Sequence, residues 1–153
     1  MRAVKLLSCI LALLSGGATD AGGQIAVIAN VDTEIEDIRL AELRDLFLGR
    51  PTSVSSRPVV LFENRDVRER FYRSAFSMGV REVKQRWIQV VLTGGRMQPP
   101  VELDADEVLS RVAETSGAIA FVDAVPTAVP TGDSVRVVRI DGRLPGEPGY
   151  PLR

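Results

Sequence analysis

The chain has 153 residues with 19 basic and 20 acidic side chains, so its formal net charge at pH 7 is −1. No block of like charge stands out, which argues against a nucleic-acid-binding surface. Histidine is absent and Cys9 is the single cysteine. The chain beyond Cys9 therefore lacks the common zinc and copper ligands and any Ser-His or Cys-His catalytic pair. We expect a protein that is not an enzyme and needs no cofactor or metal.

The first 21 residues have the order of a secretory signal peptide. A short basic segment, 1–5, precedes an apolar stretch at 6–14, and small residues follow. The apolar stretch is about half as long as a membrane-spanning helix requires, so we expect cleavage after Ala18 or Ala21 and no membrane span in the mature chain. Without Cys9 the mature chain has no disulfide, and a hydrophobic core must stabilise it. Export without disulfides suggests the bacterial periplasm.

Apolar runs alternate with helical patterns in the first half of the mature chain. A run at 25–29 predicts a buried strand, and leucines at helical spacing predict a helix over 40–47 that ends near Gly49. A second run at 59–62 predicts another strand. After a polar turn, a helix is expected from about residue 67 to 76.

The second half of the mature chain continues the same alternation. In chain order we expect a helix over 83–91, a loop at 98–100, a helix from Asp104 to 116–117 and a strand over 118–122. A loop over 126–134, an edge or half-exposed strand over 135–140 and an irregular tail over 146–152 follow. This order predicts one α/β domain over residues 22–153, with a mostly parallel sheet flanked by helices.

Polar residues follow three of the predicted strands, at 30–32, 64–66 and 123–124. Ligands of parallel α/β sheets bind beyond the carboxyl ends of the strands, so we expect these residues to share one edge. Asn30 is a candidate ligand there, although an asparagine after a strand more often makes a turn hydrogen bond. Asn64 is a candidate for the same reason.

The turn at 63–66 has two interpretations. Asp66 and Glu69 have capping-box spacing, so the Asp66 carboxylate would take the N–H groups that an anion needs and would repel the anion. Arg65 and Arg68 could instead attract phosphate or sulfate. Both interpretations, a self-capped structural turn and a weak anion site, stay open.

A glycine pair after the third helix offers a second candidate anion site. Thr93, Gly94 and Gly95 could form a nest of backbone N–H groups beside a cation, Arg96. An ordinary helix C-cap explains the glycines equally well.

Five segments taken together resemble the phosphate-binding-protein-like family of periplasmic solute-binding proteins. They are IAVIAN (25–30), LAELRDLFLGR (40–50), RPVVLFENRD (57–66), GAIAFVDA (117–124) and RIDGRLPGEPGYPL (139–152). The resemblance implies a domain like one lobe of a type II periplasmic binding protein. It also implies a role in holding phosphate or a similar oxyanion for an ABC-type transporter.

The chain departs from that family in two ways. About 130 mature residues supply one lobe of the usual two, and the Ser-Gly-Thr of the family's phosphate turn is replaced by residues 67–69, Val-Arg-Glu. Two functions therefore compete. One is a periplasmic solute-binding module. The other is a single-lobe interaction module of the cell envelope, with little or no anion binding, that docks another protein or a second copy.

Overall fold

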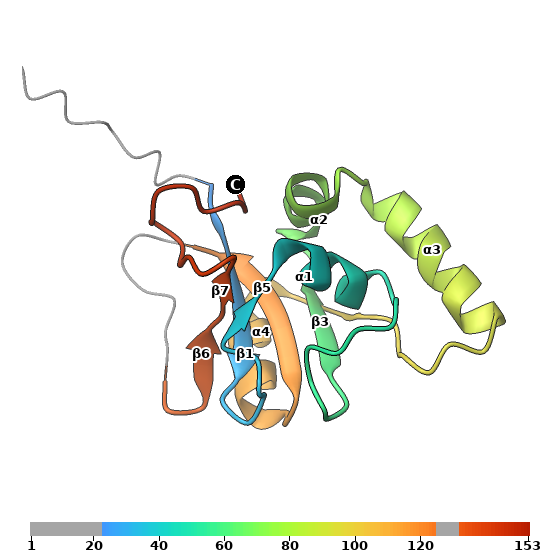
Figure 1. Ribbon diagram of the computed structural model, residues 1–153, viewed down its shortest axis with the longest axis horizontal. Coiled ribbons are helices and arrows are strands. Elements are labelled where there is room, and N and C mark those ends of the chain that lie inside the picture. The colour runs from blue at the N-terminus through green and yellow to red at the C-terminus, as the bar shows by residue number, and fades with distance from the viewer. Residues whose placement is uncertain (1–22, 125–131) are drawn as a thin grey trace, which may run out of the picture.

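The computed structural model describes residues 23–124 and 132–153 (Figure 1). The expected signal peptide and most of the loop at 126–134 lie outside these residues. The elements, in chain order, are β1 (Ile25–Asn30), β2 (Asp37–Ile38), α1 (Leu40–Phe47), β3 (Val60–Asn64), α2 (Arg68–Phe76), α3 (Val80–Leu92), β4 (Val101–Leu103), α4 (Ala105–Glu114), β5 (Ala118–Asp123), β6 (Val135–Val137) and β7 (Arg139–Ile140).

Five of the strands form one mixed sheet in the order β4-β3-β5-β1-β6. Strand β3 runs parallel to β4 and to β5, whereas β1 runs antiparallel to both of its neighbours, β5 and β6. The predicted α/β fold with a mostly parallel sheet and flanking helices is therefore confirmed, with β1 as the one reversed strand.

The direction of β1 makes the expected common ligand edge wrong. Ile25 pairs with Asp123 and Ala29 pairs with Ile119, so β1 ends where β5 begins. Because β3 is parallel to β5, Asn30 lies at the opposite end of the sheet from Arg65. The local apolar pattern of a strand does not encode its direction, which depends on its partner in the sheet.

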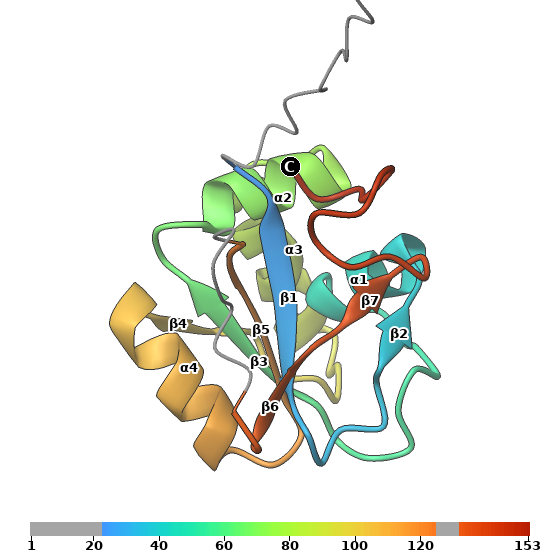
Figure 2. The same cartoon turned by 90° about the vertical axis from the view of Figure 1, so that its left-hand side faces the viewer.

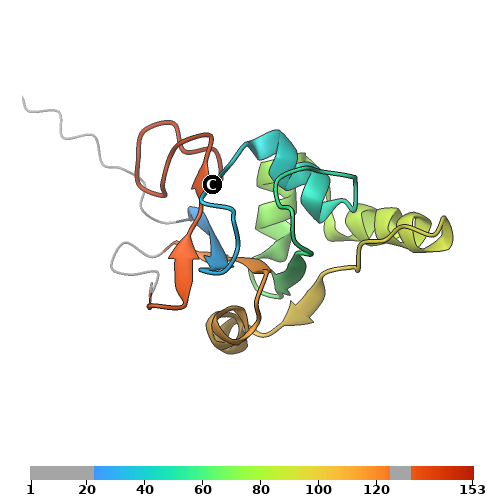
Figure 3. The same ribbon diagram turned by 60° about the horizontal axis from the view of Figure 1, so that its bottom comes forward.

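Helices cover both faces of the sheet, α1 to α3 on one face and α4 on the other (Figures 2 and 3). Side chains of β1 alternate between the two cores: Val27 and Ala29 join the larger core, and Ala26 and Ile28 join the core under α4. Burial on both faces explains why β1 is a continuous apolar run.

The larger core is built around aromatic rings. The Phe71 and Phe121 rings stack with centroids 3.9 Å apart, and Phe47 meets Phe71 edge-on at 5.1 Å. Trp87 packs against this core and donates a hydrogen bond from Nε1 to the Phe47 carbonyl oxygen at 2.9 Å. A Cβ on Gly49 would lie 2.7 Å from the Trp87 ring, so this position, with a φ of +67°, requires glycine.

The four predicted helices and the three apolar strands are present within a few residues of their expected limits. The single strand expected at 135–140 is wrong. It divides at Val138 into β6, an edge strand of the large sheet, and β7, which pairs in parallel with β2. Strands β2 and β4 are only two and three residues long, too short for a periodic signal.

The tail is irregular, as expected, but it is held against β1. The Tyr150 hydroxyl donates to the Ile25 carbonyl oxygen at 2.7 Å, and the Ile25 N–H donates to the Leu152 carbonyl oxygen at 3.1 Å. The side chains of Tyr150 and Leu152 are both buried in the larger core.

Candidate functional site

A cluster of six charged residues lies where β3 and β4 end. We call it the charge cluster; its members are Glu63, Arg65, Arg68, Lys84, Glu102 and Asp104. Parallel pairing places Glu63 opposite Glu102 in the register of β3 and β4. Two carboxylates side by side repel each other, and the cations of the cluster compensate that repulsion.

Both candidate arginines are engaged by these carboxylates. Arg65 donates from Nε to Oε1 of Glu102 at 2.7 Å and pairs with Asp104. Arg68 donates from Nη1 to Oε1 of Glu63 at 3.1 Å and also pairs with Glu102. The hydrogen bond from Arg65 lowers the pKa of Glu102 despite its partial burial, so its charge is retained.

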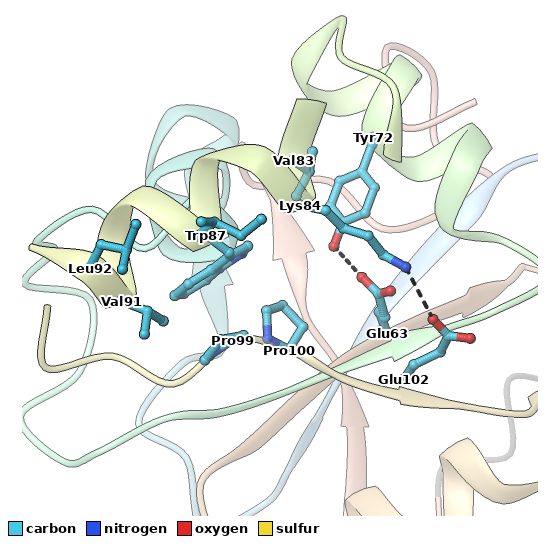
Figure 4. Close-up of a pocket in the computed structure, with 11 residues that line it drawn as sticks. Glu63, Tyr72, Val83, Lys84, Trp87, Val91, Leu92, Pro99, Pro100 and Glu102 are labelled. Atoms are coloured by element: carbon cyan, nitrogen blue, oxygen red, sulfur yellow. Dashed lines mark hydrogen bonds and ion pairs between the residues drawn. The ribbon is translucent and has the colours of Figure 1, made fainter. Parts of the chain in front are cut away.

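Glu63 is the most deeply placed member of the cluster, with 8% of its side chain exposed. Besides Arg68 it accepts a hydrogen bond from the Tyr72 hydroxyl at 2.7 Å. Burial, followed by the charge of Glu63, raises the pKa of Tyr72, so this phenol stays a neutral donor. Lys84 Nζ lies 3.7 Å from Oε2 of Glu102 (Figure 4). Three cations and three carboxylates leave the cluster with no formal net charge.

The self-capped interpretation of the turn at 63–66 is wrong in its detail. The N-cap residue of α2 is Val67, one residue later than a capping box on Asp66 requires, and no side chain caps the helix. Instead Oδ1 of Asn64 accepts the Asp66 N–H at 3.0 Å, and Glu69 pairs with Arg73. Asn64 therefore closes the turn, as asparagine commonly does.

Asn30 is buried and makes three local or helix-directed hydrogen bonds. Its Nδ2 donates to the carbonyl oxygens of Val112 and Ala113, at 2.9 and 3.0 Å, near the end of α4. Its Oδ1 accepts the Asp32 N–H at 2.9 Å. The side chain thus fixes α4 to the end of β1, and its hydrogen-bonding groups are already used.

The N–H groups of the predicted nest also have partners. Those of Thr93, Gly94 and Gly95 donate to the carbonyl oxygens of Gln89, Val91 and Val90, respectively, at 2.9–3.2 Å. Gly94 adopts a φ of +76°. This geometry is a helix C-cap.

The fold brings together three of the predicted site residues, Asn64, Arg65 and Arg68. It places Asn30 and the segment 93–95 elsewhere.

An apolar groove beside the charge cluster was not predicted from the sequence. It has a volume of about 530 Å³ and is lined by Glu63, Tyr72, Val83, Lys84, Trp87, Ile88, Val91, Leu92, Pro99, Pro100 and Glu102 (Figure 4). One signal could have revealed it: α3 carries apolar residues at 88, 91 and 92 in addition to those at 83 and 87. That set is wider than one buried stripe requires.

A solved structure shares this architecture. The fold is similar to that of a solute-binding protein. A protein described as a phosphate ABC transporter substrate-binding protein from Clostridium perfringens, solved with bound phosphate, matches with a TM-score of 0.61 and 19% sequence identity, over 80% of this chain and 47% of that one. An ABC-type phosphate transport receptor from Vibrio cholerae matches with a TM-score of 0.48 and 12% identity, over 80% of this chain and 48% of that one.

The chain therefore spans about half the length of these two proteins. At 19% identity the likeness to the Clostridium protein concerns the fold. No family model matches the sequence, and no curated protein matches it. Among the described residues, no helix is long and apolar enough to cross a bilayer, and no group of three or more acidic or cysteine side chains is arranged to hold a metal ion.

Proposed function

We propose that the mature chain is a single solute-binding-like lobe that binds a protein partner in the cell envelope, and that it is not a phosphate receptor. The observation that carries this proposal is the neutrality of the charge cluster. Arg65 and Arg68, the cations that suit an oxyanion best, already bind Glu63, Glu102 and Asp104.

A phosphate at this place would have to displace the carboxylates or lie beside them. Neither is favourable, because an anion needs several donors and no uncompensated negative charge within a few ångströms. The other candidate donors are committed as well, since Asn30 binds α4 and the N–H groups of 93–95 bind α3. An apolar groove next to the cluster is instead a feature of surfaces that bind other molecules.

Oxyanion binding for ABC-type transport is the alternative, and the phosphate held by the Clostridium protein favours it. In this alternative a second lobe or a partner chain would complete the site, because the present chain corresponds to about half of that protein. Both functions are compatible with this fold. They differ in whether Arg65 and Arg68 leave their carboxylate partners to bind an anion.

Isothermal titration of residues 22–153 with phosphate, at low and at moderate salt, distinguishes the two functions. We expect no saturable heat in the micromolar range, because the guanidiniums are already neutralised. Micromolar binding that Arg65→Ala abolishes would support the transport alternative and overturn the proposed function. Arg73→Ala is the matched control, since Arg73 is paired on α2 outside the cluster.

We also propose that residues 1–21 direct export and are removed. The support is the basic, apolar and small-residue order of this segment. Mass spectrometry of the protein recovered from the periplasm of a bacterial host is expected to give a chain that begins at Thr19 or Gly22. Recovery of the full-length chain from the cytoplasm would overturn this proposal.

A further inference from the structure

Three of the exposed large apolar side chains of the described residues line the groove. They are Ile88, Val91 and Leu92, with exposed fractions of 56%, 54% and 75%. Val101 is also exposed, but it pairs with Phe62 on the α4 side of the sheet, the face opposite the one from which Glu102 lines the groove. Scattered apolar residues are normal on a protein surface, but a contiguous set beside a groove marks a binding surface.

The groove is concave, with walls of different origin. One wall is the outer face of α3, and the other consists of Pro99 and Pro100 (Figure 4). The Trp87 ring lies between them, and its Nε1–H is already bound to the Phe47 carbonyl oxygen, so the ring presents an apolar surface. A volume of about 530 Å³ is in the usual range for sites that enclose a ligand.

The carboxylates beside the groove have more hydrogen-bond partners than the cations of α3 do. Glu63 and Glu102 each accept hydrogen bonds from two other side chains. Lys84 is 59% exposed and, within residues 23–124 and 132–153, has only its 3.7 Å pair with Glu102, so it keeps donors for another acceptor. Arg81, one turn earlier on α3, is exposed and forms no ion pair with another described residue.

We propose that this groove binds an amphipathic peptide segment of a partner protein, with apolar side chains against Trp87 and Leu92 and a carboxylate that pairs with Lys84. The proposal rests on the proposed interaction function and specifies its surface. Peptide helices commonly bind grooves in this manner, through apolar anchors three or four residues apart. The acidic residue follows from charge complementarity with Lys84 and Arg81.

Two other occupants fit the groove less well. In a symmetric dimer the same patch would face itself, and this patch offers cations without a free carboxylate to receive them. An anionic membrane would suit the cations, but a lipid surface does not fill a concave site with walls at Pro99 and on α3.

Selection from a displayed library of random short peptides tests the proposal, with residues 22–153 as the target. We expect enriched peptides to combine apolar residues three or four apart with an adjacent Asp or Glu. Synthetic versions should bind Lys84→Glu and Leu92→Ser about tenfold more weakly than the parent protein. Arg86→Glu, an equal charge change on α3 outside the groove lining, should bind normally. Peptides with Lys in place of the acid should recover affinity for Lys84→Glu.

Three results would overturn the proposal. They are selected peptides whose affinity is unchanged by Lys84→Glu and Leu92→Ser, stronger binding to phosphatidylglycerol vesicles than to any peptide, and a dimer in sedimentation that Leu92→Ser dissociates. The failure of the two proposals can be told apart. If peptides bind elsewhere on the protein and phosphate does not bind, only the assignment of the groove is refuted. Micromolar phosphate binding would refute the proposed function itself.

Discussion

Single residues in this protein are constrained mainly by close approach and by charge. Gly117 has a φ of +76°, and a Cβ there would lie 2.6 Å from the Pro58 carbonyl oxygen. Its own carbonyl oxygen accepts the Val60 N–H at 2.9 Å. Gly117 therefore lies in the turn between α4, which ends at Glu114, and β5, and it lets β3 approach β5 closely. The sequence predicts a glycine stop after the helix, but neither the earlier end of the helix nor the neighbour that excludes a side chain.

Gly117→Ala is expected to reduce the free energy of unfolding by about 2–4 kcal/mol, from the left-handed conformation and the contact with Pro58. Gly94→Ala is a matched control, because Gly94 has the same φ and nothing lies within 4 Å of its Cβ position. The control should cost only about 1 kcal/mol. Equal losses in urea unfolding of the two variants would contradict the role of the Pro58 contact.

The charge cluster predicts how stability depends on pH. The pKa of Glu102 is lowered in the folded state by its hydrogen bond from Arg65, so the unfolded state binds more protons as the pH falls through 4.5, the ordinary value. The stabilisation is present above that pH and is lost in acid. Glu102→Gln should therefore lose less stability than the parent protein between neutral pH and about pH 3.

Urea unfolding at a series of pH values measures this difference. High salt should reduce it, because the pairs of Arg65 are partly exposed and salt screens them. If the free energies of unfolding of the parent protein and the variant fell equally between neutral pH and acid, the pairing of Glu102 would contribute nothing to stability in solution.

At the scale of elements, the packing of helices on the sheet depends on a few polar contacts. Asn30 joins the end of β1 to the end of α4 through bonds to Val112 and Ala113, more than 80 residues away. A sequence places an asparagine after a strand but does not say which helix it meets. The expected ligand role of Asn30 remains a prediction, and the structure supplies a structural use for every one of its polar atoms.

Asn30→Ala is expected to destabilise the protein by about 2–3 kcal/mol, because buried carbonyl groups of α4 lose their donor. Hydrogen exchange should accelerate most in the last turn of α4. Asn30→Asp keeps the acceptor for the Asp32 N–H but directs a carboxylate at carbonyl oxygens, so it should be at least as unstable. If the Asn30→Ala protein were as stable as the parent but lost binding to a ligand, Asn30 would be a ligand-binding residue after all.

Helix α3 shows the same division between local pattern and packing. Its inner positions, Val83 and Trp87, are buried as its periodicity predicts. Its last turns remain exposed because no element of the described residues covers them. The C-cap at 93–95 follows from the glycines, whereas the groove depends on where the segment 99–102 runs.

At the scale of the whole molecule, the tail closes the larger core. Deletion of residues 148–153 removes Tyr150 and Leu152, which are fully buried, and is expected to cost about 3–6 kcal/mol in the free energy of unfolding. Deletion of Arg153 alone, whose side chain is exposed, should cost less than about 0.5 kcal/mol. Similar thermal unfolding of the two truncated proteins would contradict a structural role for the tail.

The sequence by itself determined the order and type of the main elements, since apolar runs, helical spacing and glycine stops are local properties of the chain. It also carried the resemblance to solute-binding lobes. The tertiary structure alone decided the direction of β1, the pairing of Arg65 and Arg68 with carboxylates, and the groove beside α3. These features join residues that are tens of positions apart, and such contacts follow from strand pairing and helix packing, which no local pattern specifies.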